Sequence, residues 1–443
     1  MTLLLLGRTL TFHDDPDLSG ERASHSYEER GAVAIGDDGR IAWSGPLTEL
    51  PEAYAGVPRT DFGDKIISAG FIDAHIHFPQ YRMLAAPGKD LLDWLNRFTF
   101  PEESRFGDAA HASAAASIFL DRLIAHGTTS ALVFSSVHKL AAEALFAAAE
   151  ARGMAIVTGK TMMDRNAPDS VRDDAETGGR DSQALIDAWH GRGRARYAIS
   201  PRFAITSTDA QLAVSGELLG ANPTCLMQTH LSEQAAEIAY VAELFPYAKD
   251  YTDVYDRYGL LGPTSLFAHG IHLNDRECTR LSETGSSIVH CPTSNTFLGS
   301  GLFDLGHIGN PDRPVGFGVA TDVGGGTHYS MLHTLGEARK VAQLRGCRLS
   351  ALRGLYLATL GNARLLHLEA EIGSLTAGKY ADLVVLDPRA TPVLAARDDL
   401  SETIEDRLFA LSILGDDRAI AAAYVRGKRH AAPEAANEPD PSI

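Results

Sequence analysis

Two histidines separated by one residue, His75 and His77, end an apolar run that begins after Gly70. Side chains alternate along a β-strand, so both imidazoles point to the same side of the predicted sheet, about 6–7 Å apart along the strand. They can therefore reach one metal ion, and neutral imidazole is a common ligand for zinc and iron. A pair of this kind is also compatible with a purely structural role, so the assignment depends on ligands supplied elsewhere in the chain.

Three more β-like runs end in a residue that can bind a metal or carry a proton. These residues are His230 after the run 225–229, His269 after the run 265–268 and Asp322 after the run 315–321. In a barrel of parallel strands the functional side chains lie at the carboxyl ends of the strands, so we expect these residues to converge with the histidine pair. Any one alone is compatible with packing, whereas the five together favour a metal site.

We predict that one metal ion is held by three histidines and an aspartate: His75, His77, His230 and Asp322. This mixed nitrogen and oxygen set suits Zn²⁺, with Fe²⁺ as the alternative, and disfavours Ca²⁺ and Mg²⁺. A water molecule at an open coordination position would lose a proton near neutral pH and supply hydroxide. The fourth predicted barrel strand is followed by Arg202 and not by lysine, so a carbamylated lysine that bridges two metals is not indicated.

Three residues are predicted to handle protons beside this metal. Asp322 could bind the metal and also accept a proton from the water, and His269 could orient the hydroxide and stabilise developing charge. Glu233 lies three residues after His230, at the start of the next predicted helix, where it could carry protons to and from a substrate. A carboxylate at a helix start is also favoured by the helix macrodipole, so both interpretations of Glu233 stay open.

The chain from residue 75 onward alternates short β-like runs with helical stretches. Helices are expected over 108–126, 139–152, 232–245 and 331–345, from capping residues and from apolar positions spaced three and four apart. Alternation through about eight strands indicates parallel strands joined by helical crossovers. This pattern predicts a TIM-type (β/α)8 barrel in an α/β fold.

Both ends of the chain show β character instead. Residues 2 to 62 contain a hairpin signal, Asp37–Arg40, between two apolar runs, and similar runs return after residue 371. We therefore expect a small β-sandwich domain built from residues 1–65 and 372–430, beside a barrel over 66–371. The tail 431–443 is rich in alanine, proline, glutamate and aspartate and is expected to be disordered.

Composition excludes several classes of partner. A net charge of −17 over 443 residues argues against a broad nucleic-acid surface and against contact with anionic membranes. No apolar run approaches the length of a transmembrane helix, and the first residues lack the basic region of a signal peptide. The four cysteines are widely separated, so neither a disulfide framework nor a cysteine zinc site is indicated, and a cytoplasmic location is expected.

These residues together resemble the amidohydrolase superfamily, whose members are metal-dependent barrels with a small β domain from both termini. Further stretches resemble the guanine deaminases of that superfamily. They are HFPQ at 77–80, LDWLNRFTFP at 92–101, MDRNAP at 163–168, PRFA at 201–204, THLSE at 229–233, CPTSN at 291–295 and LGSG at 298–301. The resemblance covers nearly the whole chain.

The resemblance implies hydrolytic deamination of guanine to xanthine and ammonia by a metal-activated hydroxide, with one zinc per subunit. It implies that Glu233 protonates a ring nitrogen while hydroxide attacks the amino-bearing carbon, and that Asp322 and Glu233 pass protons to the leaving ammonia. It places the substrate among metal ligands and pocket residues: His77, Gln80, Trp94, Arg202, Phe203, His230, Glu233 and Asp322. In this set Arg202 would bind the purine carbonyl, Gln80 another polar edge of the ring, and Phe203 and Trp94 would line or close the pocket.

The chemistry of Arg202 fits that role, because a guanidinium donates hydrogen bonds only and therefore favours a carbonyl over an amino group. Without the resemblance, Arg202 would be interpreted as part of a surface ion pair and Trp94 as a core aromatic. Related hydrolases acting on 8-oxoguanine, a triazine or a pterin remain alternatives, as does, more remotely, a non-catalytic barrel. The resemblance also implies a homodimer, and the ligand set does not decide between zinc and iron.

Overall fold

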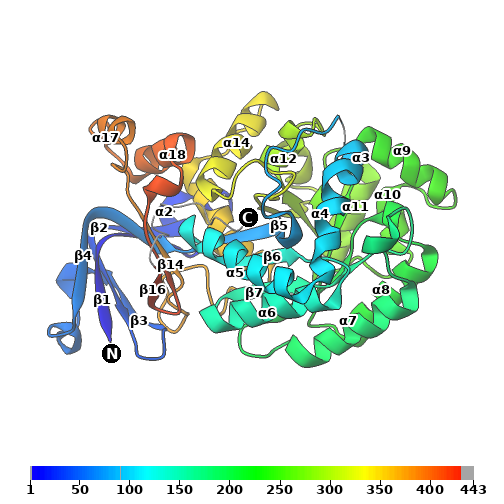
Figure 1. Cartoon of the computed structure of the whole chain (residues 1–443). Coiled ribbons are helices and arrows are strands. Elements are labelled where there is room, and N and C mark those ends of the chain that lie inside the picture. Colours follow the sequence, from blue (N-terminus) through cyan, green and yellow to red (C-terminus); the bar gives the residue numbers. More distant parts are fainter. Residues whose placement is uncertain (1, 90, 431–443) are drawn as a thin grey trace.

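The computed structural model describes residues 2–89 and 91–430. A barrel of strands wrapped in helices lies beside a smaller sheet that contains the N-terminus (Figure 1). The predicted fold class, a TIM-type barrel with a small β domain from both termini, is confirmed. The expectation of a disordered tail concerns residues 431–443, which lie outside the described ranges.

Eight parallel strands follow one another around the barrel in sequence order. They are β5 (Phe71–His77), β6 (Thr128–Phe134), β7 (Ala155–Gly159), β9 (Arg196–Pro201), β10 (Leu226–Leu231), β11 (Ser265–His269), β12 (Ser287–His290) and β13 (Gly316–Val319). A short strand, β8 (Thr161–Met162), follows β7 and pairs with β9. Most of their buried side chains are apolar, as expected for parallel strands covered on both faces, although polar ones such as Thr129, Gln228 and Thr229 are buried among them.

Helices cover the outside of the barrel and begin and end close to the predicted caps. α5 (Ala109–Ala125) begins after Asp108, whose carboxylate accepts the N–H of His111. α6 (Lys139–Arg152) ends at Gly153, which has a φ of 72°. The others are α7 (Ala175–Trp189), α8 (Asp209–Ala221), α9 (Ala235–Leu244), α10 (Tyr251–Asp256), α11 (Asp275–Thr284), α12 (Pro292–Phe297), α13 (Leu305–Ile308) and α14 (Met331–Leu344).

The start of α9 differs from the prediction. The helix begins at Ala235, not at residue 232, because Ser232 adopts a φ of 49° and Gln234 is the N-cap. A capping box joins Gln234 to Glu237 at this start. Glu233 therefore lies on the connection between β10 and α9, free of the helical geometry that the sequence pattern predicted.

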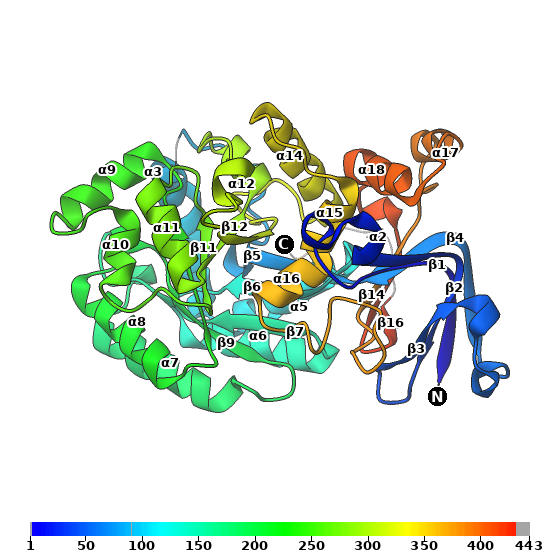
Figure 2. The ribbon, with the colours of Figure 1, turned by 180° about the vertical axis from the view of Figure 1, so that it is seen from behind.

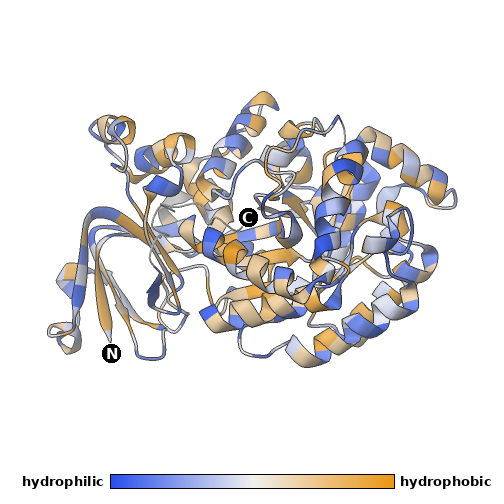
Figure 3. Cartoon of the chain, viewed as in Figure 1, coloured by the Kyte–Doolittle hydropathy of each residue, from blue (hydrophilic) through white to orange (hydrophobic). Residues whose placement is uncertain are grey.

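Figure 3 shows hydrophobic residues concentrated on the barrel strands, while the surrounding helices alternate between hydrophobic and hydrophilic stretches. This is the pattern of a core enclosed by amphipathic helices. Within 2–89 and 91–430, no helix combines the length and apolar character that crossing a bilayer requires.

The barrel closes where β5 meets the segment after β13. His77 donates its backbone N–H to the carbonyl of Val323 at 2.8 Å, and Asp322 donates to the carbonyl of His75 at 3.0 Å. The buried Asp73 carboxylate accepts the backbone N–H of Thr321 at 3.1 Å and also its hydroxyl. This seam joins the first and last barrel strands directly above the metal-binding histidines predicted from the sequence.

Asn362 links the two strands at the lower part of the seam. It lies in α16 (Asn362–Leu365), which together with α15 (Ala351–Tyr356) lies between the barrel and the small sheet (Figure 2). Its side-chain amide donates to the carbonyls of Ile72 at 2.7 Å and Val319 at 2.8 Å, and its oxygen accepts the N–H of Val319 at 3.2 Å. A β-carbon at Gly318 would lie 2.3 Å from that oxygen, so the glycine leaves room for the asparagine.

A long connection between β5 and α5 crosses the carboxyl end of the barrel. It contains η3 (Phe78–Gln80), α3 (Leu91–Trp94), the π-helical turn η4 (Leu95–Thr99), α4 (Phe100–Ser104) and η5 (Arg105–Gly107). The backbone N–H of Leu91 donates to the side chain of Gln234, at the start of α9, which anchors the connection to the opposite side of the barrel.

The small sheet has seven strands in the order β16-β15-β14-β4-β1-β2-β3. They are β1 (Leu3–Phe12), β2 (His25–Ile35), β3 (Ile41–Pro46), β4 (Arg59–Ala69), β14 (Leu383–Leu386), β15 (Ile420–Val425) and β16 (Lys428–His430). The predicted hairpin around residues 37–40 joins β2 and β3. β14 from the C-terminal part pairs antiparallel with β4, and this pairing joins the two ends of the chain.

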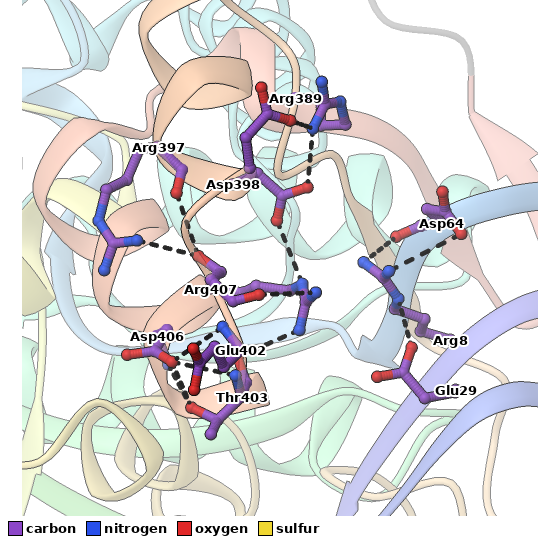
Figure 4. A network of polar contacts seen from close by, with 12 residues as sticks. Arg8, Glu29, Asp64, Arg389, Arg397, Asp398, Glu402, Thr403, Asp406 and Arg407 are labelled. Atoms are coloured by element: carbon purple, nitrogen blue, oxygen red, sulfur yellow. Dashed lines mark hydrogen bonds and ion pairs between the residues drawn. The ribbon is translucent and has the colours of Figure 1, made fainter.

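Helices also form in the C-terminal part, where the sequence pattern indicated only strands. α17 (Pro392–Asp398) and α18 (Ile404–Leu414) follow the N-caps Thr391 and Thr403 and pack with α14 and α15. Asp398 of α17 binds Arg407 of α18 at 3.1 Å, which joins the two helices. Figure 4 shows this contact and that of Asp398 with Arg389, which precedes α17. The same view shows Arg8 of β1 bound to Glu29 of β2.

The predicted domain division at residues 65/66 and 371/372 stays a proposal. β4 continues to Ala69, so its last four residues still pair within the small sheet, with β14.

We expect Asn362→Ala to lower the free energy of unfolding by about 3 kcal/mol, because it leaves two buried carbonyls and one buried N–H at the seam without partners. Thermal unfolding followed by circular dichroism measures the effect. Asn310→Ala is the matched control, since the Asn310 side chain accepts only the exposed N–H of Asp312. Equal melting temperatures for the two variants would contradict this account of barrel closure.

Candidate active site

The four predicted metal ligands meet at the carboxyl end of the barrel. His75 and His77 lie on β5, His230 lies on β10, and Asp322 follows β13. The Nε2 atoms of His75 and His77 are 3.2 Å apart, and that of His230 is 3.3 Å from that of His77. Asp322 Oδ1 lies 3.3 Å from the Nε2 atoms of both His75 and His77.

These separations fit a shared metal ion. Zinc bonds to nitrogen and oxygen are about 2.0–2.2 Å long, so adjacent ligand atoms at a tetrahedral zinc lie about 3.3–3.5 Å apart. Four pairs of these buried atoms, His75 with His77, His77 with His230, and Asp322 with each of His75 and His77, are 3.2–3.3 Å apart and match that spacing.

The histidines are electrostatically suited to act as ligands. Burial lowers the pKa of His77 to about 4, although the neighbouring Asp322 opposes that shift. Burial, followed by the charges of the neighbouring histidines, also lowers the pKa of His230 well below its usual value. His230 Nδ1 donates to the carbonyl of Arg202 at 2.6 Å, which leaves the lone pair of Nε2 directed at the cluster. Neutral rings with free lone pairs are the form that binds metal.

A second, overlapping group contains a cysteine. Ligand atoms of His75, His269, Cys291 and Asp322 all lie within 4.8 Å of one another. Burial and the charge of Asp322 raise the pKa of the Cys291 thiol well above its usual value, so the protonated form is favoured, and only the thiolate is a good ligand. We therefore favour the set that contains His77 and His230.

Two carboxyl groups in the site have opposite proton affinities. Burial, followed by the charge of Asp322, raises the pKa of Glu233 to about 8. Burial acts in the same direction on Asp322, but the adjacent imidazoles of His75 and His77 hold its pKa well below the usual value. Glu233 is therefore protonated and Asp322 ionised at neutral pH, which gives the site one proton donor and one acceptor.

His269 lies between these two carboxyl groups. Its Nε2 is 3.5 Å from Glu233 Oε2 and 4.0 Å from Asp322 Oδ2. Its Nδ1 is 2.8 Å from Asn295 Oδ1, an acceptor, so the proton is on Nδ1 and the lone pair of Nε2 points into the site. Ser300 donates its hydroxyl to Glu233 Oε1 at 2.9 Å and orients the carboxyl group.

The backbone around the site is locally strained. Ser232, His269 and Asp322 have φ values of 49°, 75° and 50°, in the left-handed region that side chains disfavour. Such conformations cost about 1–3 kcal/mol each and cluster at functional sites. All three lie at or shortly after the carboxyl ends of barrel strands.

The glycines after Asp322 allow a close approach of the backbone. A β-carbon at Gly326 would lie 1.8 Å from the carbonyl oxygen of Thr321, and one at Gly325 would lie 2.7 Å from Ser294 Oγ. The segment 324–326 therefore turns tightly beside the ligand cluster.

A cavity with about 380 Å³ of empty volume opens onto the ligand cluster. All predicted substrate contacts lie on its wall, whereas His75 lies behind it. The lining residues are His77, Gln80, Leu91, Trp94, Leu95, Arg202, Phe203, His230, Glu233, His269, Ser294, Leu298, Asp322 and Gly325.

Several residues of the site had no role assigned from the sequence. Asn295 and Ser300 lie within the CPTSN and LGSG stretches, where the resemblance was noted without assigning functions. Glu103 was not noted at all, although it is buried and binds Arg202 at 2.7 Å. Arg202 is thus in a buried ion pair, not a surface one. A carboxylate that acts through another side chain leaves no local pattern, so only the tertiary structure reveals it.

The nearest buried lysine takes no part in the cluster. Lys160 follows β7, binds Asp173 and donates to the carbonyl of Thr161, and it does not line the cavity. This arrangement supports one metal ion and not a lysine-bridged pair.

We expect His230→Ala to lose bound metal, because it removes one of three converging nitrogens. Metal content per protein chain, measured by plasma emission spectroscopy after dialysis, checks this. His13→Ala is the control, since His13 is exposed directly after β1 of the small sheet and contacts Ser26. Retention of stoichiometric metal by His230→Ala would rule out the proposed ligand set.

Comparison with known proteins places the chain in a family. The amidohydrolase family matches residues 66–429. The chain is 47% identical over 406 residues to guanine deaminase of Escherichia coli (strain K12), covering 91% of each chain. The structure of a guanine deaminase from Bradyrhizobium japonicum superposes with a TM-score of 0.93 at 37% identity, covering 97% of this chain and 99% of that one.

A third relative carries a ligand. The structure of guanine deaminase from C. acetobutylicum with guanine bound in its active site superposes with a TM-score of 0.86 at 29% identity, covering 97% of this chain and all of that one. The match of the family and the extent of these similarities lead to one assignment. The chain belongs to the amidohydrolase family, and within it to the guanine deaminases.

Proposed function

We propose that this protein hydrolyses guanine to xanthine and ammonia. The observation that carries the proposal is a single cavity that joins the ligand cluster, a protonated Glu233 and the donor-only side chain of Arg202. Relatives up to 47% identical over most of the chain are guanine deaminases, and one solved relative has guanine bound.

One metal ion would be held by His75, His77, His230 and Asp322. When bound, it lowers the pKa of a water molecule and so supplies hydroxide at neutral pH. Zinc and iron both accept these ligands, and we propose one Zn²⁺ per subunit, with Fe²⁺ as the alternative.

Guanine would be positioned by the wall of the cavity opposite the ligands. The Arg202 guanidinium would donate to the purine carbonyl, and Gln80 would meet another polar edge of the ring. Phe203 and Trp94, both buried and lining the cavity, would pack against the purine and exclude water. A guanidinium cannot accept a hydrogen bond, so the amino group of adenine is rejected at the same place.

Two carboxyl groups would then move the protons. Glu233, which is protonated at neutral pH, donates its proton to a ring nitrogen as the amino-bearing carbon is attacked. Asp322, which is ionised, accepts a proton from the attacking water. His269 offers its Nε2 lone pair between them and orients the water. Asp322 then passes its proton to the amino group, the C–N bond breaks, and the remaining hydroxyl returns a proton to Glu233 as it becomes the carbonyl. Guanine and water thus become xanthine and ammonia.

We further propose that the enzyme is a cytoplasmic homodimer. All four cysteines are free thiols, three of them buried, which suits a reducing compartment. The dimer rests on the resemblance to the family.

The test is the loss of the guanine ultraviolet band together with ammonia release, with 8-oxoguanine, adenine and cytosine assayed in parallel. We expect rapid turnover of guanine that a chelator abolishes and that zinc restores. Adenine and cytosine should remain unchanged. Metal-loaded protein that leaves guanine intact would overturn the substrate while leaving the ligand set untouched.

The raised pKa of Glu233 predicts the pH dependence. Its acid form prevails below the pKa of about 8 and is lost above it, so kcat/KM for guanine should be maintained below that pH and fall above it. Glu233→Gln removes the proton carrier, and kcat should fall about 10²–10⁴-fold. Steady-state kinetics across pH measures both effects.

Glu217→Gln serves as the control for this variant, because Glu217 is exposed on α8. It should keep the activity and pH profile of the unmodified protein. An unchanged kcat for Glu233→Gln would remove Glu233 from the mechanism.

A further inference from the structure

A buried carboxylate binds both Gln80 and Arg202, the two polar side chains that would hydrogen-bond to the purine. Glu103, on α4, is 1% exposed and is not among the residues that line the cavity. Its Oε2 accepts Arg202 Nη1 at 2.7 Å, and its Oε1 accepts Gln80 Nε2 at 2.9 Å. A buried carboxylate is costly unless both oxygens are satisfied, and here Arg202 and Gln80 satisfy one oxygen each.

This contact decides which end of the Gln80 amide is free. A carboxylate only accepts hydrogen bonds, so Gln80 must turn its nitrogen towards Glu103 and its oxygen away. The Oε1 atom of Gln80 is buried and has no hydrogen-bond partner. A β-carbon at Gly324 would lie 2.5 Å from it, so the glycine leaves room for this orientation. Gln80, which lines the cavity, therefore carries an unpaired acceptor that the N–H of a bound ligand would satisfy.

The same carboxylate holds the donor. Arg202 is 4% exposed, its Nη1 is bound to Glu103, and its guanidinium also lies 5.8 Å from the ring centroid of Phe100. A guanidinium fixed at one nitrogen has a defined direction for its remaining N–H groups. One acidic group thus orients a donor and an acceptor on the same wall of the cavity.

We propose that Glu103 is a positioning residue that sets substrate specificity, because it fixes Arg202 as a donor and Gln80 as an acceptor towards a ring carrying a carbonyl and an N–H. The inference rests on the proposed function, since it assigns the purine to this cavity. It extends that function by naming the group that determines the polarity of the two contacts.

Glu103→Gln tests this directly. The new amide can donate to Gln80, so the amide of Gln80 is free to turn its nitrogen towards the cavity, and Arg202 loses its charged partner. Binding of hypoxanthine, which has a carbonyl and a ring N–H beside it, is compared with binding of purine, which lacks both. Isothermal titration calorimetry on zinc-loaded protein measures both dissociation constants without turnover.

We expect the dissociation constant of hypoxanthine to rise about 10–100-fold in Glu103→Gln, as for other residues that orient a binding group. That of purine should change by less than about twofold, the scale of a neutral surface substitution. Equal losses for both ligands, or no loss for either, would overturn the inference, because a merely structural carboxylate does not distinguish them.

Glu102→Gln is the matched control. It makes the same chemical change at the preceding residue. Glu102 accepts two hydrogen bonds from Arg82, of 2.6 Å and 2.9 Å, and does not line the cavity. Both dissociation constants should stay at the values of the unmodified protein.

If Glu103→Gln does not fold, Gln80→Leu tests the arrangement from the other side, because it removes the acceptor and keeps most of the volume. Hypoxanthine should again lose affinity while purine does not, and an unchanged preference would reject the role given to the amide. Absence of guanine turnover by the unmodified protein would reject the proposed function, but the calorimetric comparison would still decide the role of Glu103.

Discussion

Closure of the barrel between its first and last strands is the constraint on which the rest of the structure depends. His75 and His77 lie on β5 and Asp322 lies after β13, yet their ligand atoms are 3.3 Å apart. Backbone hydrogen bonds between the same segments, from His77 to Val323 and from Asp322 to His75, fix that spacing. The bonds that complete the fold therefore also set the geometry of the ligand cluster.

The two neighbouring buried carboxyl groups differ in protonation state at neutral pH. Burial favours the neutral form of both, and it prevails at Glu233, where Ser300 supplies a neutral hydrogen bond. At Asp322 the two adjacent histidines outweigh burial and keep the group ionised. One small cavity thus holds an acid and a base at the same pH, which a hydrolytic proton transfer needs.

The strained backbone at His269 and Asp322, and the glycines after Asp322, lower local stability but give the site the geometry that its chemistry needs. Neither conformation is favoured by the residue that adopts it, so the surrounding strands and helices must enforce it. The buried ion pair of Arg202 and Glu103 also serves geometry more than stability. The cost of desolvating the two charges offsets most of their attraction, but the pair fixes the direction of both side chains.

The sequence by itself determined the elements whose signals are local. The bounds of α6 match the prediction because the apolar spacing and a terminal glycine define them, and the types of residue at strand ends indicated the ligands. Only the tertiary structure decided which of these residues meet. The late start of α9, the helices α17 and α18 inside the C-terminal β region, and the contacts of Glu103 with Gln80 and Arg202 depend on packing between distant segments. Residue type and spacing indicate the chemistry that a side chain can carry out, whereas the long-range closure of the barrel determines which other side chains it contacts.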